Sequence, residues 1–255
     1  MSPRIEALLA EIKDQHPVSK DVLERNLMLI SQLPGVDIKV VFKAPEGETA
    51  GTDMYITFHK DYGSFEGGIS NDSTKYLGPW QGNVQGRLEN LFGFNSRLTL
   101  LGAHSIDTHE MQFFSTGIQL PLMNDGLYFN IKAQISRTHP GDSLAALRLR
   151  NTFKSVSLGF TYPFILERHH RLDGGISLVF AENESFHRAV KLKREDTLRI
   201  LHGFIMYDFA DSWGGLNILT LSFSKGLRGL GAMGVSSTQK IRADSKADFL
   251  KAEFR

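Results

Sequence analysis

The sequence predicts a mainly β fold: an antiparallel transmembrane β-barrel, incomplete at about ten strands, preceded by a small α/β module. Helical spacing of apolar residues is confined to roughly the first sixty residues. From Gly63 onward, apolar and polar residues alternate with the period of two that a strand requires. Several alternating segments reach about 12–14 residues, whereas the strands of soluble proteins average about 5–6.

Composition narrows the classes of protein that fit. Hydrophobic residues make up 41% and charged residues 22% of the 255 positions, so a folded chain is expected. The formal net charge of +1 argues against nucleic acid as a partner. The lack of cysteine excludes disulfides, thiolate metal sites and cysteine nucleophiles. No apolar run reaches the ~18 residues of a membrane-spanning helix, but alternating barrel strands escape that test.

The N-terminal module is predicted from two amphipathic helices and two strands. Apolar residues recur at helical spacing over 3–13 and 19–32, and Ser2 and Ser19 stand before these runs as N-cap residues. A Leu-Pro-Gly sequence then ends the second helix. Two strand-like segments follow, at 36–42 and 54–58, and a hairpin loop at 45–53 joins them. We expect residues 1–61 to form this module and 62–255 to form barrel wall.

Alternation in the second region is clearest at 154–164. There Val156, Leu158 and Phe160 take one face, while the residues between them are small or polar. Each such segment therefore has one apolar and one polar face. The predicted strands are 63–71, 84–92, 96–104, 110–122, 126–138, 151–165, 171–181, 196–209, 215–225 and 246–255.

Connections between the predicted strands alternate between short and long, as they do in outer-membrane barrels, where the short turns lie in the periplasm. The short ones are 93–96, 123–126 and 210–214, and the long ones are 72–83, 138–150, 181–196 and 228–245. Aromatic residues near strand ends are expected in an interfacial girdle: Phe94, Tyr162, Phe164, Tyr207, Phe209 and Trp213. A soluble β-sandwich also alternates, but strand length and loop asymmetry favour the membrane barrel.

Candidate sites for chemistry are weak. His169 and His170 beside Glu167 lack a spaced third metal ligand, so we interpret them as a solvated turn. His109-Glu110 lacks the second histidine of a zinc-protease helix, and the glycines at 229–234 do not form a phosphate loop. The basic run 191–194 could attract lipopolysaccharide phosphates, although a solvated loop is the simpler interpretation. We expect no catalytic residue, no metal and no cofactor.

Two surfaces remain as candidates for binding. Polar strand residues are expected to line a hydrated pore, or simply to fill a barrel: Asn130, Lys132, Gln134, Ser155, Ser157, Thr161, Thr220 and Ser222. The first strand of the module, with Val36, Ile38, Val40 and Phe42, could accept an extended client by β-augmentation, or could pair within its own sheet.

Four stretches carry a recognisable pattern: 22–36, 71–78, 90–98 and 222–232. Together they resemble one known family, the two-partner secretion transporters that export hemolysins and adhesins. The run 22–36 resembles the second helix and strand entry of a POTRA module, and the other three resemble stretches of that family's barrel. The positions that carry the pattern are Leu23, Glu24, Arg25, Pro34, Gly35, Asn71, Tyr76, Gly78 and Gly93. Arg228-Gly229 lies on an earlier loop than the family's arginine-glycine tip motif, so no role in locking the lumen is carried over.

The resemblance implies a pore-forming outer-membrane transporter that recognises and secretes a partner exoprotein, with its N-terminal module in the periplasm. It implies three partners: the exoprotein, outer-membrane lipid or lipopolysaccharide, and the barrel assembly machinery. Since Met1 to Glu6 lacks the features of a signal peptide, we expect a piece truncated at both ends. The alternatives are an assembly factor that inserts other barrels, a nonspecific porin and a soluble β-binding protein.

Overall fold

The computed structural model describes residues 2–44, 52–106, 110–227, 229–232 and 249–254. The predicted hairpin loop at 45–53, His109, the loop 228–245 and the glycines at 229–234 therefore lie wholly or partly outside the described residues. Among the residues that are described, no helix is both long and apolar enough to cross a membrane.

The N-terminal module has the predicted order of helix, helix, strand, strand. Its elements are α1 (Pro3–Lys13), α2 (Lys20–Gln32), β1 (Val36–Lys43) and β2 (Asp53–Lys60). Ile5 and Leu8 of α1 pack with Leu29 and Ile30 of α2, and Leu166 from the large sheet joins the same buried cluster. The module is thus packed onto the sheet through shared apolar contacts.

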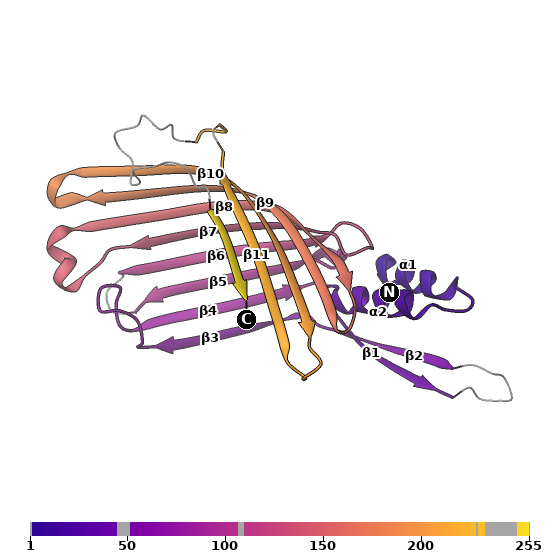
Figure 1. Ribbon diagram of the computed structural model, residues 1–255. Coiled ribbons are helices and arrows are strands. Elements are labelled where there is room, and N and C mark those ends of the chain that lie inside the picture. The colour runs from indigo at the N-terminus through magenta and orange to yellow at the C-terminus, as the bar shows by residue number, and fades with distance from the viewer. Residues whose placement is uncertain (1, 45–51, 107–109, 228, 233–248, 255) are drawn as a thin grey trace.

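The rest of the described chain forms one ten-stranded antiparallel sheet in which every strand pairs with its neighbour in sequence (Figure 1). Its strands are β3 (Gly63–Ser70), β4 (Gln81–Glu89), β5 (Arg97–Ser105), β6 (Met111–Pro121), β7 (Tyr128–Thr138), β8 (Leu149–Leu166), β9 (His170–His187), β10 (Leu192–Ala210), β11 (Leu216–Gly226) and β12 (Phe249–Phe254). This confirms the predicted fold, a mainly β chain of about ten antiparallel strands behind a small α/β unit.

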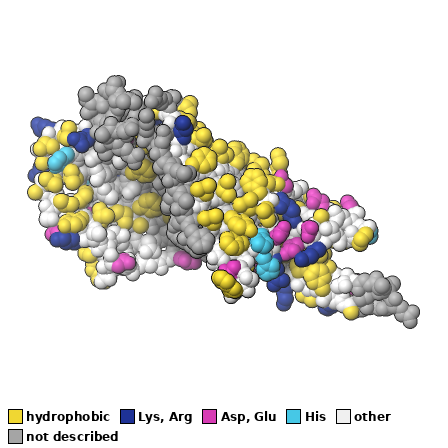
Figure 2. Space-filling view, in the orientation of Figure 1, with side chains coloured by type: hydrophobic (Ala, Val, Ile, Leu, Met, Phe, Trp, Pro, Cys, Tyr) yellow, Lys and Arg dark blue, Asp and Glu magenta, His cyan; other side chains and the backbone are white. Residues whose placement is uncertain are grey.

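The sheet has one apolar and one polar face, as period-two alternation requires. Large hydrophobic side chains on the apolar face remain exposed, among them Phe114, Phe160 and Phe223. In Figure 2, hydrophobic side chains cover much of the visible face, and Lys and Arg lie mainly toward the ends. The polar face is concave, because a single hollow on it is lined by six strands, β5 to β10.

The strands are tilted relative to the apolar band. The row of register partners that begins at Leu98 on β5 passes through Ile118, Ile131, Leu158, Leu178 and Leu201 and ends at Lys225 on β11. The row thus starts on apolar residues and ends on a charged one. On β11 the apolar residues lie closer to the preceding turn than Lys225 does: Leu219, Leu221 and Phe223. A band that shifts along successive strands in this way is what tilted barrel strands produce.

The two ends of the sheet differ, and the helices sit at the end where the short turns gather (Figure 1). We call this the module end; its turns are 90–96, 122–127, 167–169 and 211–215. At the opposite, far end, β3 and β4 are joined by 71–80, and β7 and β8 by 139–148, which holds the 3-10 helix η2 (Asp142–Leu147). The predicted asymmetry of connections holds for these loops.

One predicted long loop is wrong. Residues 181–196 are mostly strand, because β9 runs to His187 and β10 begins at Leu192, leaving only the short 3-10 helix η3 (Arg188–Val190) and one more residue between them. Polar residues occur on both faces of this part of β9 and β10, so the alternation of apolar and polar residues that predicts a strand is absent there. The strands continue by backbone pairing between β9 and β10, and the exposed Lys193 side chain contacts Glu184 across the pair and Glu195 on its own strand.

The two predicted N-cap serines occupy the cap positions, but neither side chain bonds its own helix. The Ser2 hydroxyl donates instead to Asn95 Oδ1 across 2.6 Å, which ties the start of α1 to the turn after β4. Tertiary contact thus replaces the local cap.

Candidate functional site

A row of mostly polar residues crosses the concave face from β4 to β11. Successive register partners are Glu89, Arg97, Gln119, Asn130, Gly159, Ser177, His202 and Ser224. His202 Nδ1 lies 2.8 Å from Ser224 Oγ, so polar contacts connect neighbouring strands at the β10–β11 end of the row. We call this set the polar row. The hollow beside it has a volume of about 360 Å³ and reaches the C-terminal end of α2 at Gln32.

The eight predicted pore-lining residues all lie on this concave face. Lys132 pairs with Ser157 and Gln134 with Ser155, while the Asn130 amide donates to Thr161 Oγ1 at 3.1 Å. Thr220 and Ser222 follow on β11. Their partners on β10 are Met206 and Phe204, so the wall is not uniformly polar.

Phe204 and Met206 were missed by sequence reasoning because β10 carries apolar residues at both alternating sets of positions. The Phe204 ring fills the space that a side chain at Gly175 would need, since a Cβ there would stand 2.4 Å from Cε1 of the ring. The sequence signal that could have indicated an inward-facing ring is Gly175, which lies opposite Phe204.

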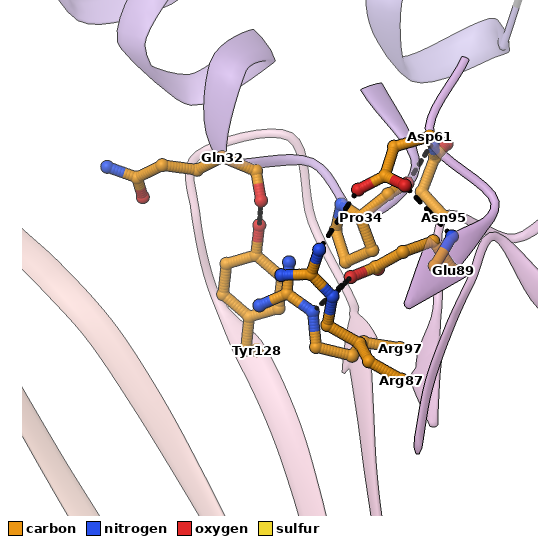
Figure 3. Close-up of polar contacts among 9 residues, drawn as sticks. Gln32, Pro34, Asp61, Arg87, Glu89, Asn95, Arg97 and Tyr128 are labelled. Atoms are coloured by element: carbon orange, nitrogen blue, oxygen red, sulfur yellow. Dashed lines mark hydrogen bonds and ion pairs between the residues drawn. The ribbon is translucent and has the colours of Figure 1, made fainter. Parts of the chain in front are cut away.

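A cluster of charged side chains occupies the module end of the concave face (Figure 3). Glu89, whose side chain is only 1% exposed, contacts Arg97 Nε at 2.7 Å and Arg87 Nε at 3.1 Å through the same carboxylate oxygen. Arg87 also reaches Asp61 at 3.2 Å, in the link between β2 and β3. The cluster therefore joins the module to the wall, and one buried oxygen of Glu89, Oε2, has no described partner.

Asn95 is the central polar residue of the contact between module and sheet. It is 2% exposed, and its amide donates to the Pro34 carbonyl oxygen at 3.2 Å (Figure 3). Its backbone N–H donates to Asn90 Oδ1 at 2.8 Å. Nearby, the Tyr128 hydroxyl donates to the Gln32 carbonyl oxygen at 3.1 Å. Nothing in the alternation pattern marks Asn95, because it lies in a turn.

Four family-pattern residues lie at this same contact. Glu24 accepts the Arg168 N–H at 3.0 Å, and Arg25 donates to the Asp125 carbonyl oxygen at 3.3 Å. Pro34 supplies the acceptor for Asn95. Gly35 has φ +79°, and a Cβ there would stand 2.7 Å from the Asn90 Cβ.

The remaining family-pattern residues are dispersed. Leu23 lines a hollow between α2 and the β8–β9 turn, and Gly93 has φ +77° in the turn after β4. Asn71, Tyr76 and Gly78 lie in the β3–β4 connection at the far end. There the Tyr76 carbonyl oxygen accepts the Gly141 N–H at 2.9 Å, so the two far-end loops are in contact.

The predicted client-binding strand is β1, which within the described residues has β2 as its single neighbour. Val36 and Ile38 pack against the module core, and Val40 is partly buried. Phe42 is 54% exposed and lines a mainly apolar hollow of about 680 Å³ together with α2 and the β8–β9 turn. Backbone groups of β1 and the Phe42 ring are therefore the accessible features.

At the histidine pair, the structure shows an aromatic contact of His170. His170 begins β9, stacks on Tyr207 with ring centroids 6.2 Å apart and lies 2.9 Å from its hydroxyl. The described residues contain no group of three metal-ligating side chains.

The predicted aromatic residues do gather at the module end. Tyr162 contacts Phe164 edge-on, Tyr207 stacks on Phe209, and Trp213 is 93% exposed in the β10–β11 turn. Exposed aromatic rings beside an apolar band are typical of a membrane interface.

Comparison with known proteins shows what this architecture is. No family model and no curated protein matches the sequence. The structure is similar to that of CdiB from Escherichia coli, with a TM-score of 0.67 and 17% identity over 85% of this chain and 41% of that one. It is also similar to CdiB from Acinetobacter baumannii, with a TM-score of 0.54 and 19% identity over 93% and 43% of the two chains.

A third similar structure is BamA from Haemophilus ducreyi lacking POTRA domains 1-3, with a TM-score of 0.51 and 10% identity over 88% and 46%. CdiB is a TpsB two-partner secretion transporter, and it shares the Omp85 β-barrel superfamily with BamA. The described fold, a long antiparallel sheet preceded by a small helical module, is therefore similar to part of the fold of these proteins. The chain spans less than half the length of each of these three structures.

Proposed function

We propose that this chain is part of an outer-membrane transporter that secretes a partner exoprotein. Residues 1–61 form a periplasmic POTRA-like module that captures the client, and 62–255 form barrel wall along which the client passes. The observation that carries the proposal is the polar row, which runs across the concave face directly beside the module. A polypeptide that crosses a bilayer through a barrel needs a polar, hydrated inner wall, while the outer face of the barrel must be apolar to contact lipid.

Client capture is assigned to β1 and the hollow beside Phe42. An extended client strand would bond the backbone edge of β1 that has no neighbour among the described residues, and such main-chain bonding is tolerant of sequence. The hollow between Phe42, Leu27 and Met28 would take an apolar side chain of that strand. Outer-membrane lipid surrounds the apolar face, and the barrel assembly machinery inserts the protein.

The absence of cysteine makes the wall directly testable, because each introduced thiol is the only one in the chain. Lys132→Cys places a thiol on the concave face, and Ile131→Cys is its matched control on the apolar face of the same strand. In the full-length transporter, with any cysteine outside these 255 residues replaced by serine, we expect a membrane-impermeant methanethiosulfonate to modify Lys132→Cys and not Ile131→Cys. Equal labelling of the two would contradict a hydrated channel.

The same thiols test secretion itself. The neighbouring reading frame is first inspected for a long exoprotein, since secretion systems usually encode one beside the transporter. That exoprotein, stalled in transit by a folded C-terminal fusion and carrying one cysteine, is the probe. A disulfide with Lys132→Cys, absent with Ile131→Cys, is the expected result. Phe42→Ala should lower the amount of exoprotein secreted. Tyr55→Ala, which removes another exposed aromatic ring on the neighbouring strand β2, should not. Full secretion by Phe42→Ala would remove the capture role.

The similarity to BamA supports a second function, insertion of other barrels into the outer membrane. The higher TM-score to CdiB, 0.67 against 0.51, favours secretion. Depletion of the full-length protein distinguishes the two, since an assembly factor would lower the amounts of many outer-membrane proteins. Depletion of a transporter would lower secretion of its exoprotein alone. Depletion of a nonspecific porin would lower neither the amounts of other outer-membrane proteins nor the secretion of an exoprotein.

A further inference from the structure

A second hollow lies on the opposite, apolar face, near the far end of the sheet. Its volume is about 590 Å³, and its apolar lining includes Val84, Phe114 and Ile135. Gly102 forms part of its floor, where a Cβ would stand only 3.1 Å from Val84 Cγ2. Arg137 lines it as well, one alternation beyond Ile135 on β7. One register row across the hollow is apolar: Val84, Gly102, Phe114 and Ile135. The next row toward the far end carries the polar groups and the cation: Gly82, His104, Gln112 and Arg137.

Arg137 belongs to a wider group of cations beyond the apolar band. Register places Arg137 opposite Thr152 on β8, so Arg150, two residues before Thr152, lies on the same face. Arg137, Arg150 and Arg188 all act electrostatically on His139 and lower its pKa, after the larger effect of its partial burial. We call these four residues the basic rim. The three arginines are exposed, and none pairs with a carboxylate among the described residues.

Neighbouring carboxylates do not neutralise the rim. Glu184 and Glu195 contact Lys193 instead. Glu110 turns toward the β7–β8 connection, where its carboxylate occupies the space beside Gly141. Among the described residues, the three arginines of the rim therefore have no carboxylate partner, and they lie immediately past a lipid-compatible surface.

We infer that the hollow and the basic rim together bind a phosphorylated, multiply acylated glycolipid of the outer leaflet. An acyl chain would lie over Gly102 between Val84 and Phe114, with a phosphate on Arg137. Further phosphates of the headgroup would meet Arg150 and Arg188. A ligand with both chains and several phosphates matches a surface that joins an apolar hollow to several guanidinium groups. The inference rests on the outer-membrane location proposed above, and not on secretion.

The two tryptophans supply a local reporter. Trp80 lies two residues before Gly82 of the hollow and is 46% exposed, whereas Trp213 lies at the module end. In the full chain carrying Trp213→Phe, held in uncharged detergent micelles, Trp80 fluorescence is followed during titration with bis-phosphorylated lipid A. Phosphorus bound to the protein after gel filtration gives a second readout. Dephosphorylated lipid A and phosphatidylglycerol are the comparison ligands.

We expect saturable binding of lipid A and much weaker binding of both comparison ligands. Arg137→Gln should weaken affinity about fivefold, and the triple substitution of Arg137, Arg150 and Arg188 about a hundredfold, at about 1 kcal/mol for each charge. Arg137→Lys should retain most of the affinity. Gly102→Val, which fills the hollow and alters no charge, should also weaken binding.

Arg194→Gln is the matched control, because Arg194 pairs with Ser185 on the other face of the same hairpin. Equal binding of all three lipids, or variants that bind like the parent, would overturn the inference. Bilayer insertion of the full-length protein, measured separately by protease protection, tells the two proposals apart. Insertion without lipid A preference would overturn only the lipid site, and failure to insert would overturn both.

Discussion

At the scale of single residues, the turn after α2 depends on the lack of a side chain at Gly35. Its φ of +79° is unfavourable for other residues, and a Cβ would meet Asn90 at 2.7 Å and the Asp61 carbonyl oxygen at 3.2 Å. Gly35→Ala should therefore destabilise the module by at least roughly 1–2 kcal/mol. Urea unfolding in micelles, followed by helical circular dichroism, measures the change. Gly67→Ala on β3 is the control, where the nearest atoms stand at ordinary contact distances of 3.5 Å or more.

Asp211 supplies a pH-dependent contact in the β10–β11 turn. Hydrogen bonds from the Asn217 amide and then the Gly215 N–H hold the Asp211 pKa below its usual value. Burial opposes them with a smaller effect, and the Trp213 N–H adds a still smaller lowering. Because the folded pKa is depressed, the stabilisation is complete above the unfolded pKa of about 3.9 and disappears as pH falls through the folded value.

The fluorescence of Trp213 in a Trp80→Phe background should report this titration below about pH 4. Asn217→Ala removes the strongest hydrogen bond and should move the midpoint to higher pH. Asp211→Asn should abolish the transition. A midpoint that is unchanged in Asn217→Ala would show that the turn does not depend on this bond.

At the scale of elements, the helices are held on the sheet by buried hydrogen bonds as much as by apolar contact. Removal of the Asn95 side chain leaves the Pro34 carbonyl oxygen and the Ser2 hydroxyl without their partner. Asn95→Ala should therefore cost roughly 1–3 kcal/mol and speed hydrogen exchange in α1 and α2, with β7 and β8 unaffected. Asn71→Ala, at an exposed position in the β3–β4 connection, should change neither. Unaltered exchange in α1 would contradict a role for Asn95 in docking.

Alternation was sufficient to predict most elements because strands with a lipid-facing and a water-facing side must alternate. It failed for the outer halves of β9 and β10, where both faces meet polar surroundings beyond the apolar band and residues such as Glu184 and Lys193 replace the pattern. It also could not reveal the Glu89 cluster or Asn95. Those contacts join residues far apart in the chain, and periodicity records only which face a residue takes.

At the scale of the whole molecule, the described sheet has two edges. β3 and β12 each have a single described neighbour, so each presents a row of backbone groups with no strand beside it. In water such an edge is solvated, but in hydrocarbon each unsatisfied group costs several kcal/mol. An open sheet of this kind has no way to satisfy those groups within a bilayer unless further strands complete it.

The 255-residue chain alone should therefore give no stable single-channel conductance in planar bilayers, although its polar row would suit a pore. The full-length transporter, in which additional strands can close the sheet, should conduct in the same bilayers and serves as the control. In micelles, where detergent and water both reach the edges, the chain alone should keep its β circular dichroism. Long-lived, uniform openings from the chain alone would mean that β3 and β12 meet each other or a second copy, and edge-directed cysteine crosslinking would then identify which.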